Sequence, residues 1–314
     1  MKKFDFDFYK NRKILFGISI GLMVIGLIFN FIRGTKMDIQ FVGGAMIKYS
    51  VDGEVDTDEI ASLVKEETGR DVSVALSKTF GTDANQVTLF FAGNEAVTLD
   101  EQQAIAQSLS DAYADRTFNV VESSSVDPTM GAKFFQKCLV CLLITFVILL
   151  VYIALRFKKI GGLSAGVMAL VALFHDVAMI YFMYVIFQMP IDASFIAVVL
   201  MILGYSLNDT IVIYDRVREE KKLVGSKTDV GKIFNLSCTK CIKRTIMTSV
   251  TTLSAILVVY AVACAFNITS VQGFALPMII GIISGCYSSI CIAGPLWVMW
   301  QRHKKAKKLA AKAA

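Results

Sequence analysis

Charged side chains are scarce in this sequence. They account for 18% of the 314 residues, whereas 55% are hydrophobic and the mean hydropathy is +0.59. A water-soluble globule of this size has more polar surface to cover, so the composition excludes a single soluble domain. It is typical of a polytopic membrane protein.

Motifs for nucleotide hydrolysis and for covalent catalysis are also missing. No Gly-x-x-x-x-Gly-Lys-Ser/Thr run occurs, and no nucleophile stands in a recognisable pattern with a base. We therefore predict that the chain is not an enzyme and needs no cofactor. Any work that it performs must be driven by an ion gradient or by partner proteins.

Cysteine is absent from residues 33–131, so this stretch carries no disulfide in any compartment. The seven cysteines elsewhere include the pairs Cys138/Cys141 and Cys238/Cys241, each with the spacing of half a zinc site. The expected membrane spans place the two pairs about a bilayer apart. We therefore predict that no metal is bound.

The two signs of charge are distributed unevenly. Residues 33–131 hold seven Lys and Arg against 17 Asp and Glu, a net charge of −10, and because the whole chain carries +6 the remainder carries +16. The basic residues lie just outside apolar runs, which favours contact with anionic membrane lipids over nucleic acid. An acidic soluble domain is thus inserted into a basic membrane protein, and we expect no nucleic-acid partner.

Six apolar runs are long enough to cross a membrane. The first follows a basic segment, 1–13, and lacks the small-residue cleavage site of a signal peptide, so we expect it to stay as a helix. Lys and Arg gather in the second and fourth loops and in the tail 301–314, which predicts cytosolic termini and an outer location for 33–131. The expected spans are 14–32, 134–155, 161–187, 191–214, 245–266 and 273–300, with a cytosolic loop at 215–243.

The acidic segment shows alternating strand and helix periods. Residues 38–50, 71–79, 86–92 and 118–125 have strand character, and helical spacing at 56–68 and 98–113 separates them. The order βαββαβ is the ferredoxin-like pattern. The predicted fold class is therefore an α-helical polytopic membrane protein with an extracytoplasmic α+β domain between its first and second spans.

Ionisable residues inside the spans are candidates for function, because each costs about 2.5–3.5 kcal/mol on insertion. Helical spacing places Asn208 and Asp209 on one side of the fourth span, and Arg244 on a polar side of the fifth. We expect Asp209 and Arg244 to face each other in proton or ion coupling, with a purely structural buried pair as the alternative. His175 and Asp176 in the third span are open to the same two interpretations.

Small residues recur at every fourth position of the sixth span. Gly273, Gly281 and Gly285 belong to this series, and such a seam allows close helix packing.

Four motifs stand in order along the chain. The longest runs from Gly204 to Glu219 and reads Gly-Tyr-Ser-Leu-Asn-Asp-Thr-Ile-Val-Ile-Tyr-Asp-Arg-Val-Arg-Glu. The others are Phe174-His-Asp176, Arg244-Thr-Ile-Met-Thr-Ser-Val-Thr-Thr252, and Phe41, Val42, Gly43 and Gly44 after the first span. Together they resemble the motifs of the SecF type of the SecD/SecF protein-export family, within the RND superfamily, and the run from Gly204 is the most specific of them.

This resemblance implies a function and partners. A SecF-type chain pairs with a SecD-like subunit, works beside the SecYEG channel in the cytoplasmic membrane, and uses the proton gradient to promote preprotein export. It also implies that Asp209 is the proton-responsive carboxylate and Arg244 its basic partner. The alternatives are a half-size RND-type exporter of lipids or drugs and a scaffold whose buried charges only fix helix register.

Overall fold

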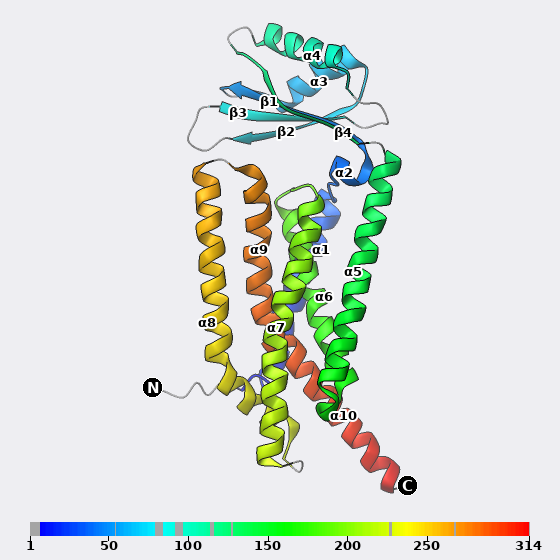
Figure 1. The fold of residues 1–314 in the computed structure, drawn as a ribbon, viewed down its shortest axis with the longest axis vertical. Helices are drawn as coiled ribbons and strands as arrows, with labels where there is room; N and C mark the ends of the chain where they lie inside the picture. Colours follow the sequence, from blue (N-terminus) through cyan, green and yellow to red (C-terminus); the bar gives the residue numbers. More distant parts are fainter. Residues whose placement is uncertain are drawn as a thin grey trace.

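The computed structural model describes residues 7–53, 55–78, 84–91, 97–113, 116–126, 128–225, 228–266 and 268–313. It is a long helical bundle with a small mixed domain at one end (Figure 1). The start of the basic segment 1–13, residues 1–6, lies outside the described residues, as does Asn267 in the fifth loop.

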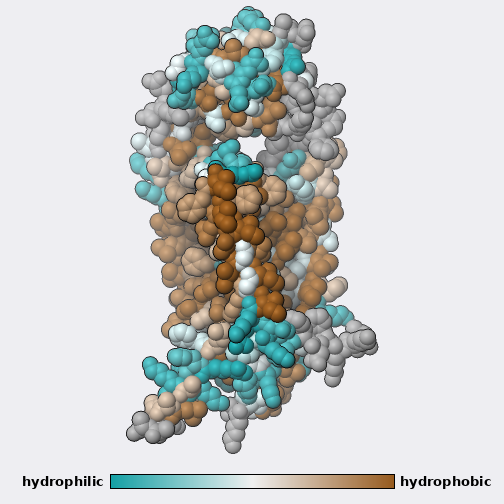
Figure 2. Space-filling view, turned by 180° about the vertical axis from the view of Figure 1, so that it is seen from behind, coloured by the Kyte–Doolittle hydropathy of each residue, from teal (hydrophilic) through white to brown (hydrophobic). Residues whose placement is uncertain are grey.

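Six helical stretches of the described chain are long and apolar enough to cross a membrane. Together they form a broad hydrophobic belt with hydrophilic surface at both ends (Figure 2). Their helices are α1 (Arg12–Arg33), α5 (Pro128–Arg156), α6 (Gly162–Ile186), α7 (Ala193–Val224), α8 (Val230–Ala265) and α9 (Thr269–Ser288), the last continued by a π-helical turn (Ser289–Ala293) and α10 (Gly294–Ala313).

Helices α7 and α8 extend well beyond the apolar runs. Residues 215–243, expected as a loop, are mostly helical, because α7 continues to Val224 and α8 begins at Val230. Asp229 caps α8 by accepting hydrogen bonds from the backbone N–H groups of Gly231 and Lys232. Charged residues outside the membrane therefore continue the helices instead of ending them.

The mixed domain contains one antiparallel sheet with the order β2-β3-β1-β4. Helices α3 and α4 lie on the sheet face turned away from the bundle (Figure 1). The buried core comes from alternate strand residues and helix stripes, including Ile47, Leu89, Ile60 and Ile105. The elements are α2 (Ile39–Val42), β1 (Gly44–Asp52), α3 (Thr57–Thr68), β2 (Val72–Lys78), β3 (Ala84–Phe91), α4 (Leu99–Ala112) and β4 (Asn119–Val126).

The segment expected as a strand at 38–50 is divided into α2 and β1. Asp38 caps α2 by accepting a hydrogen bond from the Gln40 backbone N–H at 2.9 Å. Gly43 and Gly44 follow with φ of 79° and 127°, and a Cβ on Gly44 would lie 2.5 Å from the Phe91 carbonyl oxygen. Glycine is required at Gly44 for both reasons.

The junction between domain and bundle is tightly held. The ring of Phe41 lies against Phe134 and Phe135 at the start of α5. On the other side, the Asp38 N–H donates to the Ile191 carbonyl at 3.0 Å, and the Ile191 N–H donates to the Lys36 carbonyl at 2.9 Å. These backbone bonds tie the root of the domain to the residues that precede α7.

Candidate functional site

The Asp209 carboxylate lies inside the bundle without a direct ionic partner. It is 2% exposed, and no described residue forms a hydrogen bond with its Oδ2. Arg244, on the neighbouring helix α8, acts on Asp209 electrostatically, but among the described ion pairs of up to 4.0 Å there is none between them. Arg244 therefore acts on Asp209 over a longer distance than a direct ion pair.

Asn208 does not share the environment of Asp209. The Asn208 side chain is exposed, whereas Asp209 and Thr210 are buried. Adjacent polar residues of α7 therefore face different surroundings, one on the outer surface and two inside the bundle. Asn208 and Arg244 instead line a cavity of about 940 Å³ between α7 and α8. The cavity continues toward the basic end of the molecule, where it is lined by Asp215, Arg216, Arg218, Glu219, Lys222 and Lys240.

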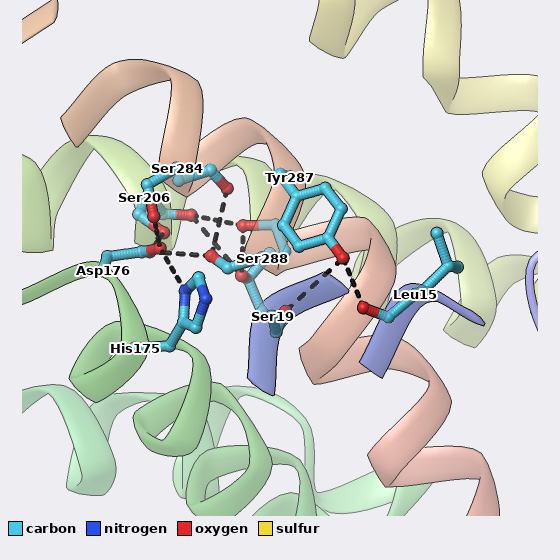
Figure 3. A network of polar contacts seen from close by, with 11 residues as sticks. Leu15, Ser19, His175, Asp176, Ser206, Ser284, Tyr287 and Ser288 are labelled. Carbon is cyan, nitrogen blue, oxygen red and sulfur yellow. Dashed lines mark hydrogen bonds and ion pairs between the residues drawn. The ribbon is translucent and has the colours of Figure 1, made fainter. Parts of the chain in front are cut away.

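Asp176 is the centre of a second polar cluster, shown in Figure 3. Its side chain is fully buried and accepts hydrogen bonds from the hydroxyls of Ser206 (2.7 Å), Ser284 (2.6 Å) and Ser288 (2.7 Å). His175 Nδ1 lies 3.3 Å from Asp176 Oδ1, while its buried Nε2 has no described partner. One carboxylate thus joins α6, α7 and α9.

Hydroxyl contacts connect this cluster with the residue after Asp209. Ser289 donates to the Ser206 carbonyl at 3.0 Å, and the Thr210 hydroxyl donates to Ser289 Oγ at 2.9 Å. Ser289 begins the π-helical turn, a deviation that is frequent at functional sites. Asp176 and Asp209 therefore belong to one polar layer of the bundle.

Two of the three sixth-span glycines allow the close packing of α9 on α7. A Cβ on Gly281 would lie 2.5 Å from Ile202 Cγ1, and a Cβ on Gly285 would lie 2.9 Å from Ser206 Cβ. Gly273 is different, because its nearest neighbour would be 4.0 Å away at the end of Met189. The approach at Gly285 brings Ser206 within reach of Asp176.

Sequence reasoning missed the three serines around Asp176. Serine is common in apolar helices and can bond to its own helix, so its presence alone gives no signal. The spacing of Ser284 and Ser288 places them on one side of α9, but only the packing shows that this side faces Asp176.

This architecture defines a class of protein. It is a polytopic membrane protein with carboxylates buried in its helical bundle and a mixed α/β domain between its first two spans. The family model for the C-terminal part of the protein export membrane proteins SecD and SecF matches residues 105–303. The chain is also 31% identical to the protein translocase subunit SecF of Rickettsia prowazekii, covering 98% of this chain and 94% of that one. It therefore belongs to the SecD/SecF family, which confirms the resemblance drawn from its motifs.

Longer proteins contain a similar portion. The chain is 29% identical to the protein translocase subunit SecDF of Bacillus subtilis, over 97% of this chain and 39% of that one. The crystal structure of SecDF from Thermus thermophilus, described as a translocon-associated membrane protein, matches with a TM-score of 0.79 and 25% identity, over 95% of this chain. This chain spans 39% of that protein's length.

Proposed function

We propose that the protein is an accessory subunit of the Sec protein translocase. Its full-length similarity to SecF subunits supports this role. Its similarity to part of two SecDF chains supports a SecD-like partner that supplies the remaining portion. In this proposal the SecYEG channel and the translocating preprotein are further partners, and the α/β domain is a ferredoxin-like module on the outer side of the cytoplasmic membrane.

The coupling site in this proposal consists of Asp209 and Arg244. The single observation that carries it is a buried carboxylate, one oxygen of which has no hydrogen-bond partner among the described residues. It lies one residue from Asn208, which lines a charged cavity together with Arg244. Burial disfavours a charged carboxylate and a nearby guanidinium favours it, so a small movement of α8 against α7 changes its proton affinity. A proton that crosses the membrane releases about 2.3 kcal/mol per 100 mV, which can bias two conformations of the outer domain.

His175 and Asp176 form the second part of the coupling machinery. Asp176 bonds to Ser206 on α7, the helix that also carries Asp209. A change in the charge of Asp176 would alter three hydroxyl contacts at once and so shift α7 relative to α9.

The test is preprotein translocation into inverted membrane vesicles, with and without an uncoupler, at matched abundance of each variant. Asp209→Asn keeps the side-chain volume but cannot titrate, so we expect normal assembly with a SecD-like subunit and loss of gradient-stimulated export. Arg244→Met should be equally defective, and Asp209→Glu less so.

Asp192→Asn is the matched control. Asp192 caps α7 through the Phe195 N–H, and asparagine caps equally well, so this variant should keep its export activity. Full uncoupler-sensitive stimulation in Asp209→Asn would rule out the coupling role and leave a structural one.

A further inference from the structure

An apolar groove with a basic rim lies where β4 meets the beginning of α5. Its volume is about 620 Å³, and its walls include Ser125 and Val126 from β4 and Met130, Lys133, Phe134 and Lys137 from α5. The four α5 residues follow the spacing i, i+3, i+4, i+7 and therefore form one stripe of the helix.

The two lysines of this groove have no acidic partner. Within the described chain, Lys48, Lys65 and Lys240 each form an ion pair with a carboxylate, whereas no ion pair or hydrogen bond is formed by the side chains of Lys133 and Lys137. Both side chains are at the surface, one helical turn apart. The rim therefore carries two positive charges that no described carboxylate neutralises.

Helix length places the lysines at the boundary of the membrane. From Lys137 to Arg156 the rise of α5 is about 28 Å, close to the roughly 30 Å thickness of a hydrocarbon core. With Arg156 at one boundary, Lys137 lies at the other and Lys133 one turn farther into the headgroup layer. The groove thus opens at the level of lipid phosphates.

An exposed apolar stripe continues from the groove toward the opposite end of α5. Val140, Ile144, Ile148 and Val151 are each about half exposed and follow Lys137 at helical spacing. The acyl chain of a lipid can lie along this apolar stripe. An extended peptide cannot, because its backbone N–H and C=O groups would have no partners in hydrocarbon.

We propose that this groove binds an anionic phospholipid of the leaflet next to the α/β domain. The phosphate lies between Lys133 and Lys137, the glycerol region fills the groove beside Met130 and Phe134, and one acyl chain follows the exposed stripe of α5. The lipid links the end of β4 to the membrane surface and so holds the domain at a fixed height.

Tryptophan quenching by brominated lipids tests the site. The variant Val140→Trp, one turn from Lys137, reports on a bound acyl chain in vesicles. The signal of the parent chain, which has the native Trp297 and Trp300, is subtracted. We expect brominated phosphatidylglycerol to quench with a relative affinity on the order of tenfold above that of brominated phosphatidylcholine, because each lysine contributes several-fold.

The double variant Lys133→Gln/Lys137→Gln should lose this preference, and raised salt should weaken it in the parent. Lys36→Gln is the matched control, because Lys36 is an exposed lysine at the same end of the bundle on another segment, and it should keep the preference. Inorganic phosphate at matched ionic strength should not compete. Equal quenching by both lipids, an equal loss in Lys36→Gln, or displacement by phosphate would each overturn the proposal.

Discussion

At the residue scale, Asp176 differs from Asp209 because its carboxyl group is surrounded by hydroxyl donors. Three serine hydroxyls from two helices have their acceptor in this one side chain. A buried carboxylate with several donors is held in a single geometry, whereas Oδ2 of Asp209 has no hydrogen-bond partner in the described part of the chain. The two acids therefore respond differently to substitution.

Asp176→Ala should lower the stability of the bundle by about 3 kcal/mol, because the serine hydroxyls lose their acceptor in a buried site. Thermal unfolding of the purified protein in detergent would show this as a drop of several degrees. Ser254→Ala serves as the control, since among the described residues the exposed Ser254 hydroxyl bonds only to the Val250 carbonyl of its own helix. An unchanged melting temperature in Asp176→Ala would mean that the serines re-bond within their helices.

The pair Asp229 and Arg302 gives a pH-dependent prediction outside the membrane. The hydrogen bond from the Arg302 guanidinium, 2.6 Å long, holds the pKa of Asp229 below its ordinary value. A lowered pKa in the folded state stabilises the protein above the unfolded pKa of about 3.9, and this contribution disappears as the pH falls through the lower folded pKa.

Asp229→Asn keeps the helix cap but removes the charge. We expect it to cost no more than about 1 kcal/mol at neutral pH, because the ion pair is partly exposed. The difference from the parent should vanish in unfolding measurements near the folded pKa. A difference that persisted there would show that the amide disturbs the cap itself.

At the element scale, the close packing of α9 on α7 depends on glycine, which has no side chain. Gly285→Ala should destabilise the bundle by about 1–3 kcal/mol, since the new methyl group meets the Cβ of Ser206, which cannot move away without its helix. Gly21→Ala is the matched control, because its new methyl would have no neighbour within 4 Å and alanine favours a helix. Unfolding curves of the two variants should therefore shift in opposite directions, and parallel shifts would contradict the packing argument.

The sequence was sufficient to predict elements whose signals are local. Apolar runs indicated six candidate spans, and helical spacing over 98–113 indicated α4. In the structure, Thr98 and Glu101 form a capping box with both reciprocal hydrogen bonds at the start of that helix. The extension of α7 to Val224 and the division of 38–50 could not be predicted in this way. The first depends on ion pairs such as Arg216 with Glu220, and the second on the approach of Gly44 to Phe91.

The candidate site, too, could be predicted only in part from the sequence. Intramembrane acids are visible in a sequence because they are costly, so Asp176 and Asp209 could be singled out. The hydrogen-bond partners of these acids could not be predicted from the sequence, because the direction in which an acid points depends on how the helices rotate against one another. The structure gives Asp176 its serines from α7 and α9 and leaves Arg244 at the cavity wall.

At the scale of the whole molecule, the loop charges predict that both ends face the cytosol and the α/β domain faces outward. In a cysteine-free background of intact cells, a membrane-impermeant thiol reagent should label Glu66→Cys, on the exposed side of α3. It should not label Lys305→Cys on α10 until the membrane is permeabilised. Labelling of Lys305→Cys alone in intact cells would reverse the topology.

The backbone hydrogen bonds between Ile191 and residues 36 and 38 link any tilt of α7 to a displacement of the segment at the base of the α/β domain. Asp209 lies about 24 Å below the first residue of α7 by helix rise, so a tilt of about 5° around Asp209 displaces the outer end by about 2 Å. Because backbone groups form this connection, the displacement passes to α2 and β1 without depending on any side chain. A small rotation of α7 about the buried acid is thus magnified at the base of the α/β domain. Ile191→Pro would weaken the connection, because proline has no N–H to donate to the Lys36 carbonyl, while its own carbonyl still accepts from the Asp38 N–H.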